Sequence, residues 1–142
     1  MKKILNQFKQ SNIPTWINIL QILLIAIQVQ QAYQFYFDMN AISESGINTQ
    51  GIANQNLIFE FAARTLTMAV VSILIVLSQD TKLYIVMFIM NILREGQETI
   101  IDPMYPLLNA PVTPKTDLIL HLVIVGIEFI ALLSLVKIFR KS

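Results

Sequence analysis

The chain has 142 residues, of which 55% are hydrophobic and only 13% are charged, with a mean hydropathy of +0.61. Soluble domains carry about 25% charged residues, so this chain has too few charged side chains to cover a water-soluble surface. The net charge of +1, without an extended basic face, excludes a typical nucleic-acid-binding protein. The absence of cysteine excludes disulfides, thiolate metal sites and cysteine nucleophiles.

Four apolar stretches are long enough to cross a bilayer, for which a helix needs about 20 residues. They cover residues 13–37, 57–78, 83–101 and 118–136. The first stretch follows three lysines, but its apolar run is long and it lacks a small-residue cleavage site, so we expect an uncleaved anchor. The connections are a polar segment, a tight turn and a loop with four prolines, which are Pro103, Pro106, Pro111 and Pro114.

Positive charges outside the spans fall mainly in segments that a four-span chain places on one side. These charges are Lys2, Lys3, Lys9, Lys82, Lys137, Arg140 and Lys141, whereas the other two loops hold only Lys115. Because cytoplasmic loops hold the excess of Lys and Arg, we expect a multi-pass membrane protein with both termini in the cytoplasm. The predicted fold is all-α: a single transmembrane domain over residues 1–142, forming an up-down four-helix bundle.

The most informative residues are ionisable side chains inside the predicted spans. A charge at the bilayer centre costs about 2.5–3.5 kcal/mol on insertion scales, so such side chains should face inward and be paired. The spacing of four residues between Glu60 and Arg64, and between Arg94 and Glu98, places each pair on one helical face. The predicted topology brings most of these polar groups to the outer half of the membrane.

We therefore expect one shared polar cavity, open to the outer side, that binds or transports a small polar molecule or ion. Its candidate residues are Gln28, Gln31, Glu60, Arg64, Asn91, Arg94, Glu95, Glu98, His121 and Glu128. The glutamines are most simply explained as interhelical hydrogen-bonding groups. The alternative for the whole set is structural, with wet interfacial residues and Arg/Glu pairs that hold helices together without a ligand.

Two residues of the fourth span have separate interpretations. Glu128 is the deepest ionisable residue and lacks a partner on its own helix, so it is a candidate proton carrier or cation contact. His121 lies near the outer interface, and we expect it to hydrogen-bond within the cluster rather than to bind a metal. A single histidine with scattered carboxylates lacks the ligand spacing of a zinc site.

Catalytic signatures such as a phosphate-binding glycine loop or a nucleophile elbow are missing from the sequence. We expect no cofactor, no metal and no enzymatic activity. An acid/base enzyme that acts on a lipid-borne substrate stays open, using Glu95, Glu98 or Glu128 together with His121.

The second span has an arginine in Phe61-Ala-Ala-Arg64, and the third has a polar end, Asn91-Ile-Leu-Arg-Glu-Gly-Gln-Glu-Thr-Ile-Ile-Asp102. With these features, the layout resembles that of small bacterial DoxX-like four-helix membrane proteins, and this resemblance implies a protein of the bacterial inner membrane. It covers the span pattern of the whole chain but no specific motif, so no functional residue is transferred. The chain lacks the cysteines of redox-active four-helix families and the span-one glutamate of small multidrug transporters.

Two functions from different classes remain. The first is a binding or transport protein for a small polar or cationic ligand, favoured as a homo-oligomer because four helices are few for a transporter. The second is a non-catalytic structural or assembly subunit that meets a membrane-protein partner. A polar residue facing outward from the bundle would distinguish the second function from the first.

Overall fold

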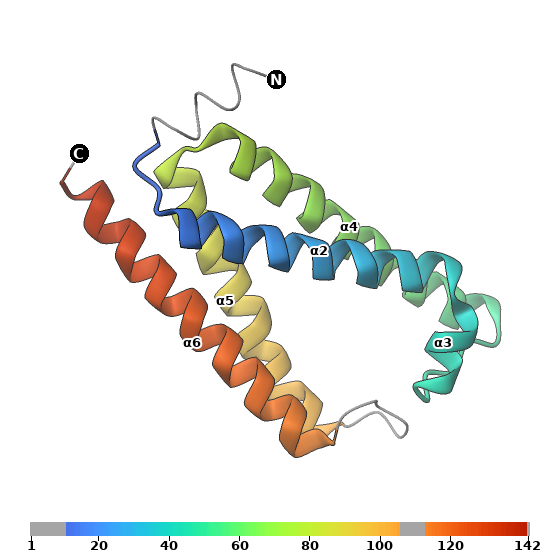
Figure 1. Cartoon of the computed structure of the whole chain (residues 1–142). Coiled ribbons are helices and arrows are strands. Elements are labelled where there is room, and N and C mark those ends of the chain that lie inside the picture. Colours follow the sequence, from blue (N-terminus) through green and yellow to red (C-terminus); the bar gives the residue numbers. More distant parts are fainter. Residues whose placement is uncertain (1–10, 106–112, 142) are drawn as a thin grey trace.

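The computed structural model describes residues 11–105 and 113–141. They form the helices α2 (Thr15–Phe37), α3 (Met39–Glu44), α4 (Ile52–Ser78), α5 (Thr81–Met104) and α6 (Pro114–Phe139) (Figure 1). Helices and connecting loops account for both described ranges, with no strand in them, so the all-α prediction is confirmed. Three segments are long and apolar enough to cross a membrane, as expected of a membrane protein: α2, α4 and Lys115–Phe139 of α6.

The third predicted span, residues 83–101, is observed as part of the 24-residue helix α5, which does not meet this criterion of length and apolar composition. The polar segment after α2 contains a short helix, α3, which was not predicted from the sequence. The Asp38 carboxylate begins α3 by accepting a hydrogen bond from the Ala41 amide at 3.1 Å. In the proline-containing loop, Pro103 lies inside α5 and Pro114 begins α6. The predicted loop residues Pro106 and Pro111, and the N-terminal lysines, lie outside the described residues.

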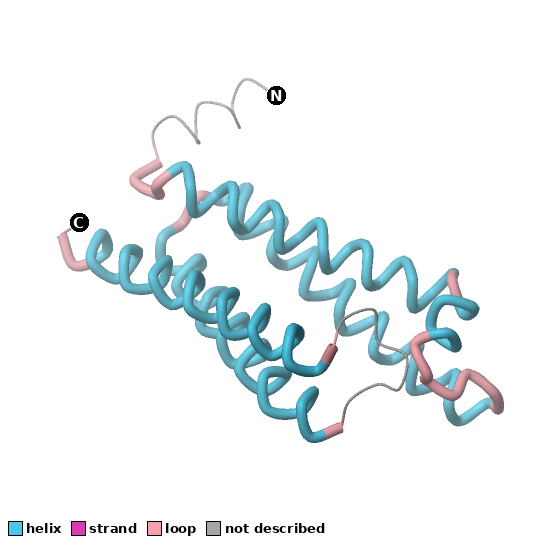
Figure 2. The backbone as a smooth tube through the Cα atoms, turned by 60° about the horizontal axis from the view of Figure 1, so that its bottom comes forward, coloured by secondary structure: helices cyan, strands magenta, loops and turns pink. Residues whose placement is uncertain are grey.

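The long helices are arranged as two antiparallel pairs rather than as one uniform bundle. Helix α2 packs along α4, and α5 packs along α6, whereas α4 and α5 make few contacts. Both views show that the pairs meet near the start of α2 and the α4–α5 turn, and diverge toward the other end (Figures 1 and 2). We call these the joined end and the open end. The predicted four-helix bundle is therefore not confirmed.

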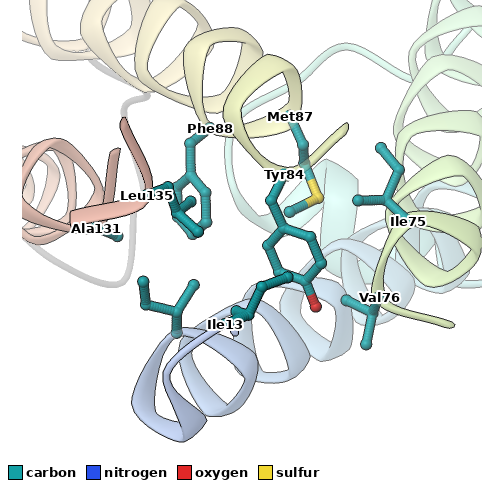
Figure 3. Packing of buried hydrophobic residues seen from close by; sticks show 9 residues of the cluster. Ile13, Ile75, Val76, Tyr84, Met87, Phe88, Ala131 and Leu135 are labelled. Carbon is teal, nitrogen blue, oxygen red and sulfur yellow. The ribbon is translucent and has the colours of Figure 1, made fainter. Parts of the chain in front are cut away.

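An apolar core holds the joined end together, with contributions from all four long helices (Figure 3). Its buried members are Ile13, Ile17, Ile75, Val76, Tyr84, Met87, Phe88, Ala131 and Leu135. Tyr84 and Phe88 are completely buried, so large aromatic groups fill the space where the two pairs meet. The relative position of the pairs is thus fixed mainly at this end.

A small polar network, which we call the node, lies beside this core and consists of Asn18, Gln79 and Tyr84. The Tyr84 hydroxyl donates to the Asn18 side-chain oxygen, and the Gln79 amide donates to the same oxygen at 3.0 Å. Gln79 ends α4 in a left-handed conformation with φ 53°. This conformation is unfavourable for residues other than glycine, so the side-chain hydrogen bonds help to stabilise the turn.

Candidate functional site

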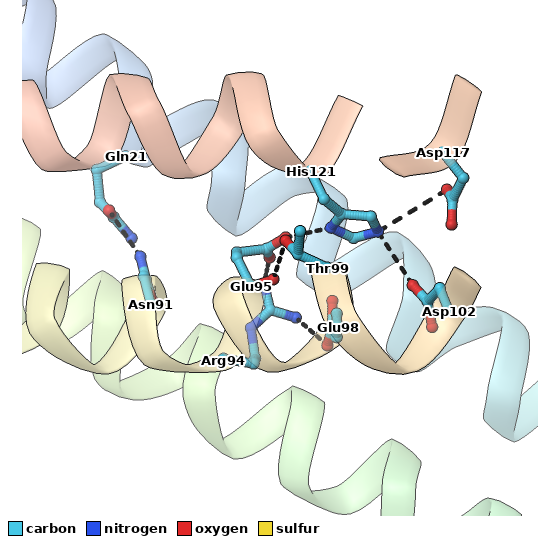
Figure 4. A network of polar contacts seen from close by, with 9 residues as sticks. All are labelled: Gln21, Asn91, Arg94, Glu95, Glu98, Thr99, Asp102, Asp117 and His121. Carbon is cyan, nitrogen blue, oxygen red and sulfur yellow. Dashed lines mark hydrogen bonds and ion pairs between the residues drawn. The ribbon is translucent and has the colours of Figure 1, made fainter. Parts of the chain in front are cut away.

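Six ionisable side chains gather where the second half of α5 faces the first half of α6 (Figure 4). We call this group the His121 cluster, and its members are Arg94, Glu95, Glu98, Asp102, Asp117 and His121. The α5 members recur every three or four residues after Glu95, so they share one face of that helix. Because α5 and α6 are antiparallel, this face in the C-terminal half of α5 meets the N-terminal turns of α6.

His121 bridges the two helices through both nitrogens of its ring. Its Nδ1 lies 2.9 Å from Oε2 of Glu95. Its Nε2 lies 3.2 Å from Oδ2 of Asp102 and 3.8 Å from Oδ1 of Asp117. The His121 side chain is only 16% exposed, so carboxylates rather than solvent form most of its polar surroundings. The expected hydrogen bonding of His121 within the cluster is therefore present.

Glu95 lies at the centre of the cluster and is 5% exposed. One of its oxygens faces His121, and the other forms an ion pair with Arg94. Arg94 also reaches Glu98 at 3.5 Å, which confirms the predicted pair with a spacing of four residues. The contact between the adjacent residues Arg94 and Glu95 was not predicted, since their Cα–Cβ bonds diverge by about 100° around a helix.

Deeper between the helix pairs, four buried polar side chains form what we call the polar interior. They are Gln21 and Gln28 on α2, Asn91 on α5 and Glu128 on α6, and none is more than 1% exposed. The Asn91 amide reaches the Gln21 side-chain oxygen at 3.5 Å. The two helix pairs are therefore connected by side-chain amides on the open side of the apolar core as well as by the node.

Several polar atoms of this region make no hydrogen bond within the described residues. They are Nε2 of Gln21, both amide atoms of Gln28, Nε of Arg94 and both carboxylate oxygens of Glu128. Glu128 interacts electrostatically with Glu95 and Arg94, and Asn91 adds a favourable polar interaction without hydrogen-bond geometry. Each unsatisfied buried group costs about 1–3 kcal/mol, and charged groups cost more. The polar interior therefore carries hydrogen-bonding capacity that the described residues leave unused.

A cavity of about 90 Å³ opens beside the polar interior, between α4 and α5. A water molecule needs only about 10–15 Å³ of such space, so several waters or a small solute fit. Its wall is mostly apolar, with Thr67, Ser72 and Asn91 as polar members. Asn91 belongs both to this wall and to the polar interior, and the cavity therefore offers an approach between the helix pairs.

The structure brings together six of the ten predicted site residues. They lie along the α5–α6 interface and are Asn91, Arg94, Glu95, Glu98, His121 and Glu128. Gln28 is buried on α2 but contacts none of them through a hydrogen bond. Gln31 is only half-buried on α2. Glu60 and Arg64 form their predicted pair at 3.2 Å, but their side chains are 52% and 78% exposed on α4. They therefore do not contribute to the cluster.

Three residues of the site were missing from the predicted set: Gln21, Asp102 and Asp117. Asp117 was missed because the fourth span was predicted to begin at residue 118, although its spacing of four from His121 places both on one face. Asp102 ends the polar stripe of α5, beyond the predicted end of the third span. Gln21 lies on α2 at a spacing of seven residues from Gln28. Only its burial in the structure distinguishes it from exposed neighbours.

The α5–α6 interface thus carries a bridging histidine, a buried carboxylate with two unpaired oxygens and a chain of acidic groups between them. Comparison of the chain with protein families, curated proteins and solved structures found no match, and the DoxX-like resemblance stays a prediction.

Proposed function

We propose that this membrane protein binds a small cation in the polar interior, as the binding step of a transport or sensing activity. The observation that carries the proposal is Glu128, which is 1% exposed and has no hydrogen bond to either carboxylate oxygen within the described residues. A buried carboxylate is stable only when it is protonated, paired or in contact with a cation. Gln28 presents further unsatisfied polar atoms from the opposite helix pair.

The charge balance of the α5–α6 interface supports a positively charged ligand. Its acidic groups are Glu95, Glu98, Asp102, Asp117 and Glu128, whereas Arg94 and His121 are its only basic groups among the described residues that take part in these interactions. Even with a protonated histidine, acidic groups exceed basic groups. In a medium of low dielectric constant, such an excess is stabilised by bound cations or by protons.

The proposal includes α5 as a fourth membrane-spanning helix. Its charged residues face α6, and its opposite surface is apolar, with Val86 53% exposed, Leu93 60% and Ile100 65%. A helix with this division can lie in lipid when its polar face is covered by a neighbouring helix. The polar interior then lies within the bilayer, where a cation site serves either transport or sensing.

A thermal-shift experiment on the purified full chain in detergent tests the proposal. The probes are sodium, potassium, tetramethylammonium and manganese(II) chlorides at constant ionic strength, with wild type, Glu128→Gln and the exposed-surface control Glu44→Gln. A cation at about 100 times its dissociation constant stabilises by about 2.7 kcal/mol, a rise of about 5–10 °C in melting temperature. We expect Glu44→Gln to keep the shift and Glu128→Gln to lose it. The absence of a shift in wild type, or an equal shift in Glu128→Gln, would contradict the proposal.

The Glu60–Arg64 pair supports a second candidate function, a structural or assembly subunit of a membrane complex. Both side chains are more than half exposed on an otherwise apolar helix, where lipid is a poor solvent for charge. A partner helix that covers the pair would remove this cost. The test is the native mass of the protein extracted from its own membranes with a mild detergent. A complex that dissociates in Arg64→Leu, but not in Glu44→Gln, would favour this function; a monomer in all three proteins would exclude it.

A further inference from the structure

The orientation of His121 is that of a metal ligand. Histidines that bind metals usually donate the ring N–H on the far side to a carboxylate, which fixes the tautomer and the direction of the ring. Glu95 occupies this supporting position, 2.9 Å from Nδ1 of His121, and is itself held by Arg94. With Nδ1 donating to Glu95, Nε2 is the ring nitrogen left to coordinate a metal, and it faces Asp102 and Asp117 (Figure 4).

The three groups on this side have the spacing of a metal site. Nε2 lies 3.2 Å from Asp102 and 3.8 Å from Asp117, and all three ligand atoms lie within 4.8 Å of one another. Ligands about 2.0–2.2 Å from a tetrahedral zinc ion are about 3.3–3.6 Å apart. Small side-chain movements therefore suffice to coordinate one ion, with a fourth position left for water or a further oxygen.

The charges around this triad favour a metal over a simple hydrogen-bonded cluster. The carboxylates of Asp102 and Asp117 lie close enough to interact with each other, and the only ion pairs observed for them within the described residues are with His121. Arg94 pairs with Glu95 and Glu98 instead. Hydrogen bonding alone accounts for the contact between Nδ1 of His121 and Glu95. It does not account for two carboxylates, those of Asp102 and Asp117, around the single nitrogen Nε2.

Glu128 provides an independent indication that a cation enters this cluster. It lies seven residues after His121 on the same face of α6, is 1% exposed and has no hydrogen bond to its carboxylate within the described residues. Its charge interacts with Glu95 and Arg94 at the inner side of the cluster. A second potential ligand group, consisting of Glu95, Glu98 and His121, lies between the outer triad and Glu128. Acidic groups thus extend from the triad to the polar interior.

We propose that Asp102, Asp117 and the Nε2 of His121 bind one divalent transition-metal ion at the open end of the α5–α6 pair. This inference rests on the proposed function, because it names the class of cation that reaches Glu128. One imidazole nitrogen with two carboxylate oxygens suits Zn²⁺, Mn²⁺, Fe²⁺ or Co²⁺. Mg²⁺ and Ca²⁺ prefer sites made entirely of oxygen, and alkali ions gain little from an imidazole.

Cobalt(II) titration of the untagged full chain in detergent, after removal of metals with EDTA, tests the inference. Co²⁺ in a tetrahedral site with nitrogen and oxygen ligands has a visible absorption band that reports its coordination. We expect one Co²⁺ per chain, displaced by Zn²⁺ and not by Mg²⁺. Asp117→Asn should bind at least about 10-fold more weakly, because a neutral amide replaces an anionic ligand, and His121→Gln should lose the band. The control Glu44→Gln should bind like wild type.

Asp117 is 30% exposed, so Asp117→Asn keeps the test valid if His121→Gln does not fold. Failure of wild type to bind Co²⁺, or equal binding by Asp117→Asn and wild type, would overturn the inference. The experiments distinguish failure of this inference from failure of the proposed function. Sodium, potassium or tetramethylammonium shifts that depend on Glu128, without Co²⁺ binding, would overturn only the metal site. Co²⁺ binding that depends on Asp117 in a protein whose thermal shifts are independent of Glu128 would support the metal site and overturn only the role of Glu128.

Discussion

The two helix pairs differ in where their charged residues lie. In the α2–α4 pair, the ionised groups of α4 pair with each other on its exposed surface, as Glu60 does with Arg64. In the α5–α6 pair, ionisable groups meet across the interface, with Glu95 between Arg94 and His121. The same i,i+4 sequence pattern therefore marks a self-contained surface pair in one case and part of an interhelical site in the other.

The buried residues of the first pair explain this difference. α4 buries mainly small side chains at intervals of three or four residues, among them Ala62, Thr65, Ala69 and Ser72. Small residues let two helices approach closely and leave little room for charged side chains between them. α5 and α6 instead bury Asn91, Glu95 and Glu128 toward the open end. Close packing of the first pair and polar contacts in the second thus occur at the same level of the molecule.

The largest expected effect comes from removing the central charge of the second pair. We expect Glu95→Ala to lower the free energy of unfolding by about 3–5 kcal/mol, because it leaves Arg94 and His121 without their shared partner. The corresponding change in the first pair, Glu60→Ala, should cost less than about 1 kcal/mol, as for other exposed ion pairs. Reversible unfolding by sodium dodecyl sulfate in mixed micelles measures both. Equal losses would show that the exposed and buried pairs do not differ in energy.

A smaller effect is expected where the two pairs join. Tyr84→Phe removes the hydroxyl that donates to Asn18 and accepts from Gln79 at 3.1 Å, while preserving the buried ring. We expect a loss of about 1–2 kcal/mol, typical of a buried hydrogen bond between side chains. The same unfolding assay measures it, with Tyr33→Phe on the exposed surface of α2 as the control. A loss in Tyr84→Phe no larger than that of the control would mean that the apolar core alone holds the joined end.

The smallest expected effect has the opposite sign. Gln28→Leu should raise the free energy of unfolding by up to about 1 kcal/mol, because it removes two buried polar atoms that have no hydrogen bond within the described residues. The stabilised variant should also bind the cation more weakly in the thermal-shift assay, as expected when unfavourable polar groups are retained for function. A destabilised Gln28→Leu would instead show that Gln28 holds the two pairs together.

Much of the local structure was predictable from the sequence, because long apolar runs indicate helices whatever their surroundings. The pairs Glu60–Arg64 and Arg94–Glu98 followed from their spacing. The direction in which the Glu60–Arg64 pair faces was not predictable from the sequence. α4 is apolar on most of its circumference, so its pattern does not reveal which face meets α2. Hydropathy alone also cannot show that Glu128 faces α5, because burial depends on how the helices cross.

The divergence of the two pairs was unpredictable for a different reason. Hydropathy and loop lengths favour antiparallel neighbours but contain no information on the angle between successive hairpins. That angle depends on the left-handed Gln79 and on aromatic packing around Tyr84 and Phe88. Asparagine or glycine would have indicated a left-handed residue at this turn, whereas glutamine gives no such signal.

Because the node lies at one end of the molecule, a rotation of one helix pair relative to the other would pivot about it. By helical rise, Gln21 lies about 4.5 Å and Gln28 about 15 Å along α2 from Asn18. A rotation of about 10° between the pairs therefore moves Gln28 by about 2.6 Å but Gln21 by less than 1 Å. The contact between Gln21 and Asn91 would then persist while the separation of Gln28 from the α5–α6 pair grows by about the diameter of a water molecule. A hinge motion of this size would be enough to admit water or a small solute between the pairs.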